Sequence, residues 1–210
     1  RRAKILNQLL ELAPDKPWSP TKGLSSPLRP YQLKGVNWLR FLFEKKLGGL
    51  LCDDMGLGKT HQAMALMVWL KEKQKLKEPF LVVCPTTVIS HWLAKIHDHA
   101  PGLSAVVYHG DNRDIEDVLQ QGDVLLTSYG ILRNDLLALQ RIPFSLVVFD
   151  EAQNLKNRDT HSYQAASLLQ AGMRLGLTGT PIENSLLELK SIFDLVLPGY
   201  LGSDEEYAAR

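Results

Sequence analysis

The sequence is poor in cysteine and has no long hydrophobic run. It holds two cysteines in 210 residues, Cys52 and Cys84, and each lies in or next to a short apolar run, which favours small core side chains over redox chemistry. No apolar stretch approaches the length that spans a bilayer, and the N-terminus lacks a signal-peptide pattern. We therefore expect a cytoplasmic protein, in a reducing compartment, with no membrane partner.

An excess of either charge is also missing. Lys and Arg number 24 against 23 Asp and Glu, a net charge of +1, so no overall basic field indicates a polyanionic partner, although a local basic patch suffices. His91, His97 and His99 lie near one another without Cys or carboxylates at zinc-ligand spacing. We expect these histidines on the exposed end and sides of a helix that begins after Pro85.

Apolar residues make up 45% of the sequence, which indicates a folded domain with a sizeable core. From Leu28 onward strand-like runs alternate with helix-like runs, and this order predicts an α/β fold with a mostly parallel sheet and helices on both faces. The predicted strands lie near 48–52, 80–84, 105–108, 123–127, 145–149 and 174–178. The predicted helices lie near 31–45, 60–73, 86–99, 112–120, 130–138, 159–170 and 185–195, with an amphipathic helix at 2–12.

The segment 53–60 has the composition of a loop that holds nucleotide phosphates. It lies between an apolar run and a helix-like run, the strand–turn–helix context that such a loop requires. Gly56 and Gly58 let the backbone approach phosphate oxygens, and the first amides of the helix point at the anion. Lys59 can reach the β- and γ-phosphates, and the Thr60 hydroxyl can ligate Mg²⁺. The residues predicted to bind nucleotide here are Asp54, Met55, Gly56, Leu57, Gly58, Lys59 and Thr60.

One position departs from the usual pattern of such loops. A glycine normally precedes the Gly-Lys-Thr triplet at the place that Asp53 occupies. The alternative interpretation is a chance Gly-Lys-Thr in a surface turn.

A carboxylate pair follows the apolar run 145–149. That run has the composition of a parallel strand covered on both faces, and open α/β sheets bind ligands at the carboxyl ends of their strands. Asp150 can hold Mg²⁺, directly or through its water, and Glu151 can orient and deprotonate an attacking water. With Lys59 and Gln153 they form the predicted catalytic set, and the alternative for the pair is a solvated loop.

A third apolar run leads into Thr178-Gly179-Thr180-Pro181. Thr178 and Thr180 can hydrogen-bond near the γ-phosphate and relay its presence. The alternative is an ordinary helix start, with Thr180 near the N-cap and Pro181 in the first turn. Both interpretations can hold together.

With these three elements in order, the chain resembles the Swi/Snf-type ATPases of helicase superfamily two, in a bacterial-type version, over about residues 27 to 203. The segment 28–39 resembles the adenine-recognition segment of the family, with Gln32 as the implied adenine contact. Asp53 is common at the first position of the family's phosphate loop. Gln153 often replaces the usual final His in bacterial members. Further matches lie at 81–92, 125–129, 150–157, 178–184 and 197–202.

The resemblance implies a RecA-like P-loop NTPase domain that uses ATP and Mg²⁺ to move along double-stranded DNA without full strand separation. It also implies association with the nucleoid if the host is a bacterium. Relatives face nucleic acid with the turn at the start of 86–99. Candidate phosphate contacts are Thr86, Thr87, Thr127, Ser128 and Lys156, and for each Thr or Ser a helix cap or turn is the alternative.

The resemblance further implies a second RecA-like lobe, whose arginines reach the γ-phosphate, and nothing after Asn184 matches its motifs. We therefore expect an N-terminal helix and linker at 1–27, the first lobe at 28–203 and a tail at 204–210 leading to that lobe. Alone, the chain should bind ATP with Mg²⁺ weakly and hydrolyse it negligibly.

Two other functions remain open. One is an RNA or single-strand helicase lobe of the same superfamily, against which the segments 28–32 and 178–184 argue. The other is a nucleotide-dependent docking module, against which the intact Lys59, Thr60, Asp150 and Glu151 argue.

Overall fold

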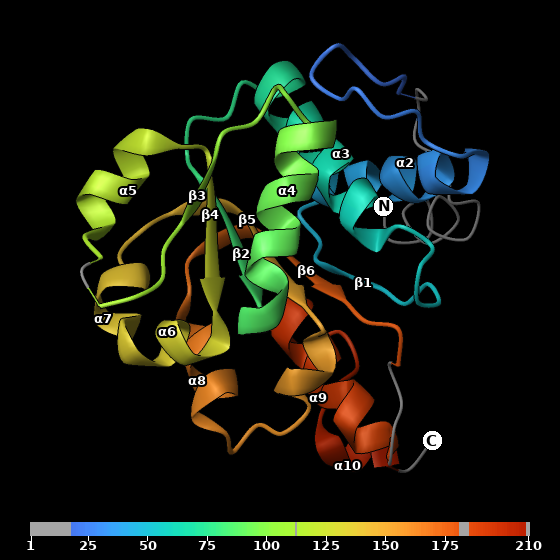
Figure 1. Cartoon of the computed structure of the whole chain (residues 1–210). Coiled ribbons are helices and arrows are strands. Elements are labelled where there is room, and N and C mark those ends of the chain that lie inside the picture. Colours follow the sequence, from blue (N-terminus) through green and yellow to red (C-terminus); the bar gives the residue numbers. More distant parts are fainter. Residues whose placement is uncertain (1–17, 112, 181–184, 209–210) are drawn as a thin grey trace.

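A computed structural model describes residues 18–111, 113–180 and 185–208 of the chain. In these residues six parallel strands form one sheet in the order β1-β6-β5-β2-β4-β3, with helices on both faces (Figure 1). The predicted α/β fold with a parallel sheet is therefore confirmed. The predicted helix at 2–12 lies outside the described residues.

The elements follow the predicted order closely. The strands are β1 (Gly49–Leu51), β2 (Phe80–Cys84), β3 (Ala105–Val107), β4 (Val124–Ser128), β5 (Phe144–Asp150) and β6 (Ala171–Leu177). The helices are α2 (Pro30–Glu44), α3 (Lys59–Lys73), α4 (Ile89–His99), α5 (Ile115–Gln121), α6 (Tyr129–Asn134), α7 (Leu136–Leu139), α8 (His161–Leu168), α9 (Leu186–Val196) and α10 (Asp204–Ala208), with the 3-10 turns η1 (Thr86–Val88) and η2 (Ala152–Leu155). The helix predicted at 130–138 is divided into α6 and α7, and that at 86–99 begins with η1.

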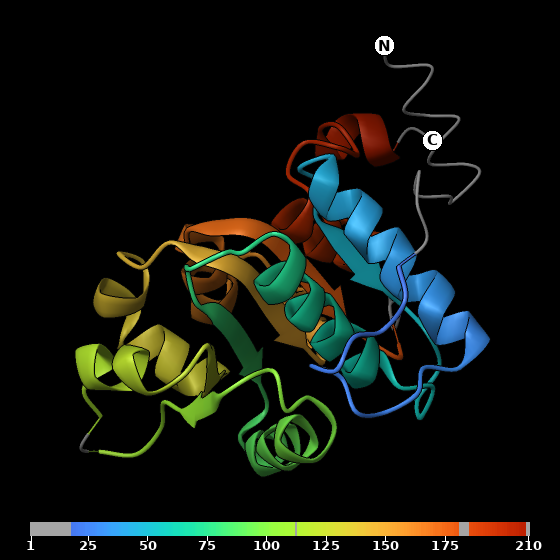
Figure 2. The ribbon, with the colours of Figure 1, turned by 90° about the horizontal axis from the view of Figure 1, so that it is seen from above.

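Each face of the sheet has its own core, and β2 contributes to both. Phe80 and Val82 join the core that packs under α2, α3 and α4, whereas Leu81 and Val83 join the core on the other face. All residues of β2 are buried, as expected for a strand in a parallel sheet that is covered on both sides. Figure 2 shows α2 and α3 lying side by side over one face.

The two cysteines differ in their environment. Cys84 in β2 is buried, and burial beside Asp150 raises the pKa of its thiol to about 12, so the prediction of a core side chain is confirmed there. The same prediction is wrong for Cys52, which is exposed. The reason is that β1 ends at Leu51, so Cys52 already belongs to the loop that leaves the sheet.

The described part of the predicted linker packs on the domain as a strap. The buried Trp18 donates its backbone N–H to Asn37 Oδ1 in α2 at 2.9 Å. Ser25 donates its backbone N–H to the carbonyl of His99 at the end of α4. Residues 18–27 therefore connect two helices that lie on the same face of the sheet.

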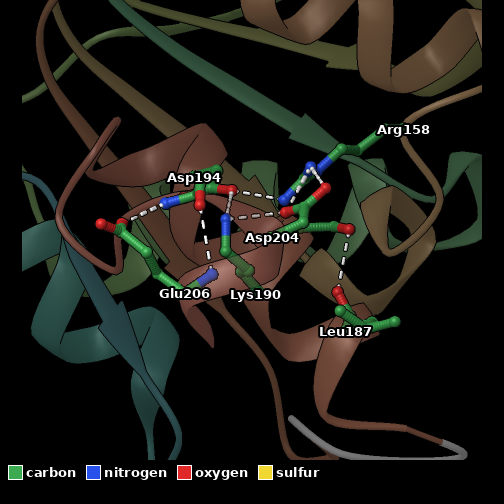
Figure 3. A network of polar contacts seen from close by, with 8 residues as sticks. Arg158, Leu187, Lys190, Asp194, Asp204 and Glu206 are labelled. Atoms are coloured by element: carbon green, nitrogen blue, oxygen red, sulfur yellow. Dashed lines mark hydrogen bonds and ion pairs between the residues drawn. The ribbon is translucent and has the colours of Figure 1, made fainter. Parts of the chain in front are cut away.

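Charged side chains tie α10 to α9 (Figure 3). Lys190 in α9 is almost fully buried, and its Nζ lies 2.7 Å from Asp194 Oδ2 and 3.0 Å from Asp204 Oδ1. Arg158, which follows η2, pairs with the same two carboxylates. The segment that was predicted as a tail therefore contains a helix whose first residue is held by two cations.

We predict that Lys190→Met lowers the thermal unfolding midpoint by several degrees, because it leaves Asp194 and Asp204 with one cation fewer. Thermal denaturation followed by circular dichroism measures this. Lys73→Met, which removes an exposed lysine in the last turn of α3, is the control. Equal midpoints for the two variants would contradict the structural role of Lys190.

Candidate nucleotide-binding site

The predicted phosphate loop connects β1 to α3. Gly58 is the N-cap of α3, and both Gly56 and Gly58 have left-handed backbones, with φ of +82° and +79°. Only glycine adopts this conformation at little cost. A Cβ on Gly58 would also lie 2.3 Å from Gln32 Nε2. The loop thus reaches the start of α3 through two positions that disfavour any side chain, and the first amides of α3 open toward the loop.

The Lys59 ammonium lies on the loop itself. Its Nζ donates to the backbone oxygens of Asp53 at 2.6 Å and Asp54 at 3.1 Å. The Asp53 carboxylate accepts a 2.7 Å hydrogen bond from Gln62 Nε2 in α3. Asp53, which stands where such loops usually have glycine, is therefore anchored by its side chain, and its backbone oxygen accepts a hydrogen bond from Lys59. Sequence reasoning gave Gln62 no role.

Two side chains of α2 hold the other side of the loop. Gln32 Nε2 and the Tyr31 hydroxyl both donate to the backbone oxygen of Leu57, at 3.1 and 3.0 Å. Gln32 Oε1 accepts the backbone N–H of Arg29 at 2.9 Å. Contact between Gln32 and adenine stays a prediction. Such a contact would replace one of the hydrogen bonds that the Gln32 side chain makes here.

Asp150, the last residue of β5, has both carboxylate oxygens engaged. Oδ2 accepts a 2.7 Å hydrogen bond from the indole Nε1 of Trp92, and Oδ1 accepts the backbone N–H of Glu151 at 3.0 Å. Burial raises the pKa of Asp150, whereas these two donors lower it because they favour the charged carboxylate. The carboxylate is thus oriented by two fixed donors.

A chain of hydrogen bonds runs from Glu151 to the residues after β6. Glu151 Oε2 accepts from Gln153 Nε2 at 2.8 Å, and Gln153 Oε1 accepts from the Thr178 hydroxyl at 2.8 Å. The Thr178 oxygen in turn accepts the backbone N–H of Thr180 at 3.1 Å. Glu151 itself has a φ of +50°, an uncommon backbone for a residue with a side chain. The structure therefore connects both predicted relay threonines to Glu151 through Gln153.

One cavity, of about 460 Å³, brings the separate segments together. Lys59 and Thr60 line it from the phosphate loop, and Asp150 and Glu151 line it from the end of β5. Its volume lies in the usual range for small-molecule sites. The other lining residues are Ser26, Pro27, Arg29, Tyr31, Gln32, Met55, Gly56, Gly58, His61, Val88, His91, Lys95 and Gly179.

Mg²⁺ in phosphoryl-transfer sites is usually held by one or two protein oxygens together with substrate phosphates. Thr60 and Asp150 both line the cavity and together provide two such protein oxygens. A larger cavity, of about 600 Å³, opens around Phe80 and Asp123. It lies at the amino ends of β2 and β4, away from the residues with predicted chemistry.

The candidate DNA contacts divide into exposed and buried side chains. Thr86 and Thr87 are exposed in η1. Thr127 is fully buried and its hydroxyl donates to the Tyr108 carbonyl at 2.9 Å. Ser128 is buried too, and its Oγ accepts the Ile131 N–H as the N-cap of α6. Both hydroxyls therefore serve the fold, as in the alternative of a cap or turn, and a DNA contact through the backbone amides of Thr127 and Ser128 stays a prediction.

Lys156, Thr180 and Pro181 were also given roles in the predicted site. Lys156 follows η2, and its Nζ lies 3.6 Å from Glu188 Oε1, so it is partly neutralised in this structure. Ser185 caps α9 by accepting the Glu188 N–H. The alternative role of Thr180 near a helix N-cap depends on the residues that follow it and stays a prediction. Pro181 lies outside the described residues.

The fold and the cavity define a nucleotide-binding domain of the α/β P-loop class. The sequence matches the SNF2-related domain over residues 31–210. The chain therefore belongs to the SNF2-related family, and the predicted Swi/Snf resemblance is confirmed. None of the described helices is both long and apolar enough to cross a bilayer.

Similar proteins come from several domains of life. The chain is 37% identical to the TATA-binding protein-associated factor MOT1 of Saccharomyces cerevisiae over 224 residues, which cover 100% of this chain and 12% of MOT1. It is 43% identical over 180 residues to the protein YwqA of Bacillus subtilis, covering 84% of this chain and 20% of that protein. The chain thus spans a minor part of these relatives' length.

The fold agrees with a solved structure of the same family. The SWI2/SNF2 ATPase core of Sulfolobus solfataricus in complex with double-stranded DNA is 39% identical and superposes with a TM-score of 0.82. The match covers 92% of this chain and 40% of that one. The predicted RecA-like fold is therefore confirmed.

We predict that Gly58→Ala weakens ATP binding by roughly tenfold or more, because a side chain at this left-handed position costs about 1–2 kcal/mol and displaces Gln32. Titration calorimetry with ATP and Mg²⁺ measures the affinity. Gly130→Ala is the matched control, since its Cβ would meet no atom closer than 3.7 Å. Unchanged affinity in Gly58→Ala would show that the loop does not bind phosphates in this conformation.

Proposed function

We propose that this chain is the ATP-binding first lobe of an ATP-dependent translocase that moves along double-stranded DNA and remodels protein–DNA complexes. The observation that carries the proposal is the single cavity lined by Lys59, Thr60, Asp150 and Glu151. Family membership supports it, as does the DNA-bound ATPase core among the similar structures. The complete protein is then an ATP hydrolase whose activity depends on DNA.

The phosphate loop binds the triphosphate in this proposal. The Lys59 ammonium exchanges the backbone oxygens of Asp53 and Asp54 for β- and γ-phosphate oxygens. The amides at the start of α3 and the loop glycines surround the same phosphates. Thr60 and Asp150 would hold Mg²⁺, which when bound neutralises charge that develops on the phosphates.

Glu151 acts on the attacking water. Its carboxylate orients the water and accepts a proton from it, while Gln153 holds Glu151 Oε2 at 2.8 Å. Thr178 and Thr180 continue this hydrogen-bonded chain, so a shift of the segment after β6 is transmitted to Glu151. This is a physical route by which the state of the γ-phosphate and the position of that segment affect each other.

The protein binds the sugar–phosphate backbone of DNA and does not recognise the base sequence. The exposed Thr86 and Thr87 at η1 and the partly exposed Lys156 are the candidate side-chain contacts to phosphate. The domain at 28–203 pairs with a second RecA-like lobe that supplies arginines to the γ-phosphate, and 204–210 leads toward it. The protein acts where DNA is held, in the cytoplasm with the nucleoid if the host is bacterial.

We predict that Glu151→Gln, in the two-lobe protein, lowers the turnover number about 100-fold or more and leaves ATP affinity within about twofold, because glutamine cannot accept the proton. Steady-state hydrolysis and equilibrium binding of ATP give the two values. Glu116→Gln, an exposed change in α5, is the control. Unchanged turnover in Glu151→Gln would favour a docking module over a motor.

We also predict that affinity for duplex DNA falls steeply with salt and varies little with sequence. Lys156→Gln should lower the slope of log affinity against log salt by about 1, since one phosphate contact is lost. Fluorescence anisotropy with several duplexes over a range of NaCl concentrations measures this. Lys73→Gln is the control, and a flat salt dependence of the unmodified protein would argue against DNA binding.

A further inference from the structure

We propose that Trp92 is a positioning residue for Mg²⁺: its indole N–H fixes the Asp150 carboxylate and links it to the exposed turn η1. The inference rests on the proposed function, because it assigns a partner to the carboxylate that holds Mg²⁺. Trp92 itself lines no part of the nucleotide cavity. It therefore acts through Asp150 and does not touch the nucleotide.

The contact is short and rigid. Trp92 Nε1 lies 2.7 Å from Asp150 Oδ2, and the Trp92 side chain is fully buried in the core shared by α2, α3 and α4. A side chain packed on all sides keeps one rotamer, so the N–H keeps one direction. Because the Glu151 N–H occupies Oδ1, the plane of the carboxylate is set by two donors on separate oxygens.

Trp92 has no substitute in this role among the described residues. Its indole is the side chain that donates to Asp150, and the other donor is a backbone N–H. Lys59, the nearest cation of the phosphate loop, donates to the backbone oxygens of Asp53 and Asp54. Partners that orient a metal-holding carboxylate typically contribute tenfold or more to metal affinity.

The position of Trp92 in the chain makes this contact a link between two surfaces. Trp92 lies in the first turn of α4, which continues directly from η1, where Thr86 and Thr87 are exposed. Because η1 and α4 are continuous, a displacement of η1 would be passed to the start of α4, which carries the indole. The predicted DNA-facing turn thus lies in the same continuous segment as the indole that holds the predicted Mg²⁺ carboxylate of β5.

The test is the Mg²⁺ dependence of ATP hydrolysis by the two-lobe protein carrying Trp92→Phe, which keeps an aromatic ring and removes the N–H. The half-saturating Mg²⁺ concentration should rise about tenfold, with the turnover number at saturating Mg²⁺ within about threefold of the unmodified protein. Trp69→Phe, another buried tryptophan, is the matched control and should leave the Mg²⁺ dependence unchanged. A half-saturating Mg²⁺ concentration within twofold of the unmodified protein in Trp92→Phe would overturn the inference.

Asp150→Asn separates this inference from the proposed function. If Asp150→Asn leaves hydrolysis intact, the proposed function fails; if only Trp92→Phe is silent, the inference alone fails. Should Trp92→Phe not fold, the unmodified protein labelled with 5-fluorotryptophan carries the test. One fluorine resonance should shift on addition of ADP and Mg²⁺, and the shift should vanish in Asp150→Asn. Absence of a shift in the unmodified protein would overturn the inference.

Discussion

Parallel pairing of β6 between β1 and β5 is the constraint on which the whole site depends. Because β6 pairs with β1 on one side and with β5 on the other, the phosphate loop, Thr178 and Asp150 leave the same edge of the sheet. The Thr178 backbone N–H donates to the Leu51 carbonyl at 3.1 Å and so extends this pairing to the start of the loop. Backbone hydrogen bonds alone therefore bring together these segments, which are far apart in the sequence.

The strand order also explains which side chains hydrogen-bond to one another at the carboxyl ends of the strands. Thr178 lies between the loop that carries Lys59 and the strand that carries Asp150, and it hydrogen-bonds to Gln153. From there the chain of hydrogen bonds continues to Glu151. The indole of Trp92, which belongs to α4, donates to the Asp150 carboxylate. The two predicted catalytic carboxylates are therefore each held by a different neighbouring element.

Much of this arrangement could be predicted from the sequence, because it depends on local pattern. The apolar runs, the loop glycines and the carboxylates at the end of a strand each have a signal within a few residues. The strand order has no such signal, since any of several parallel orders buries the same runs. Gln62 and Trp92 were missed for a related reason: each acts on a residue of another element, and only the folded chain brings them together.

The environments of Thr127, Ser128 and Cys52 also depend on the folded chain. Thr127 and Ser128 are polar residues at the end of a strand, where a ligand-facing hydroxyl is plausible, but their hydroxyls are used by Tyr108 and by the cap of α6. Cys52 follows an apolar run, yet β1 ends one residue before it. The burial of each of these side chains depends on where its strand ends and on which backbone group lies near it in the folded chain. Composition predicts neither.

The proposed mechanism requires Lys59 and Asp150 to act on the same magnesium triphosphate. A crystal structure of the domain with Mg²⁺ and a non-hydrolysable ATP analogue tests this requirement. We expect Lys59 Nζ to lie within hydrogen-bonding distance of a β- or γ-phosphate oxygen, and Asp150 to contact the Mg²⁺ on the same nucleotide, directly or through one water. A nucleotide bound elsewhere, or one that touches Lys59 while its Mg²⁺ lies away from Asp150, would contradict the mechanism.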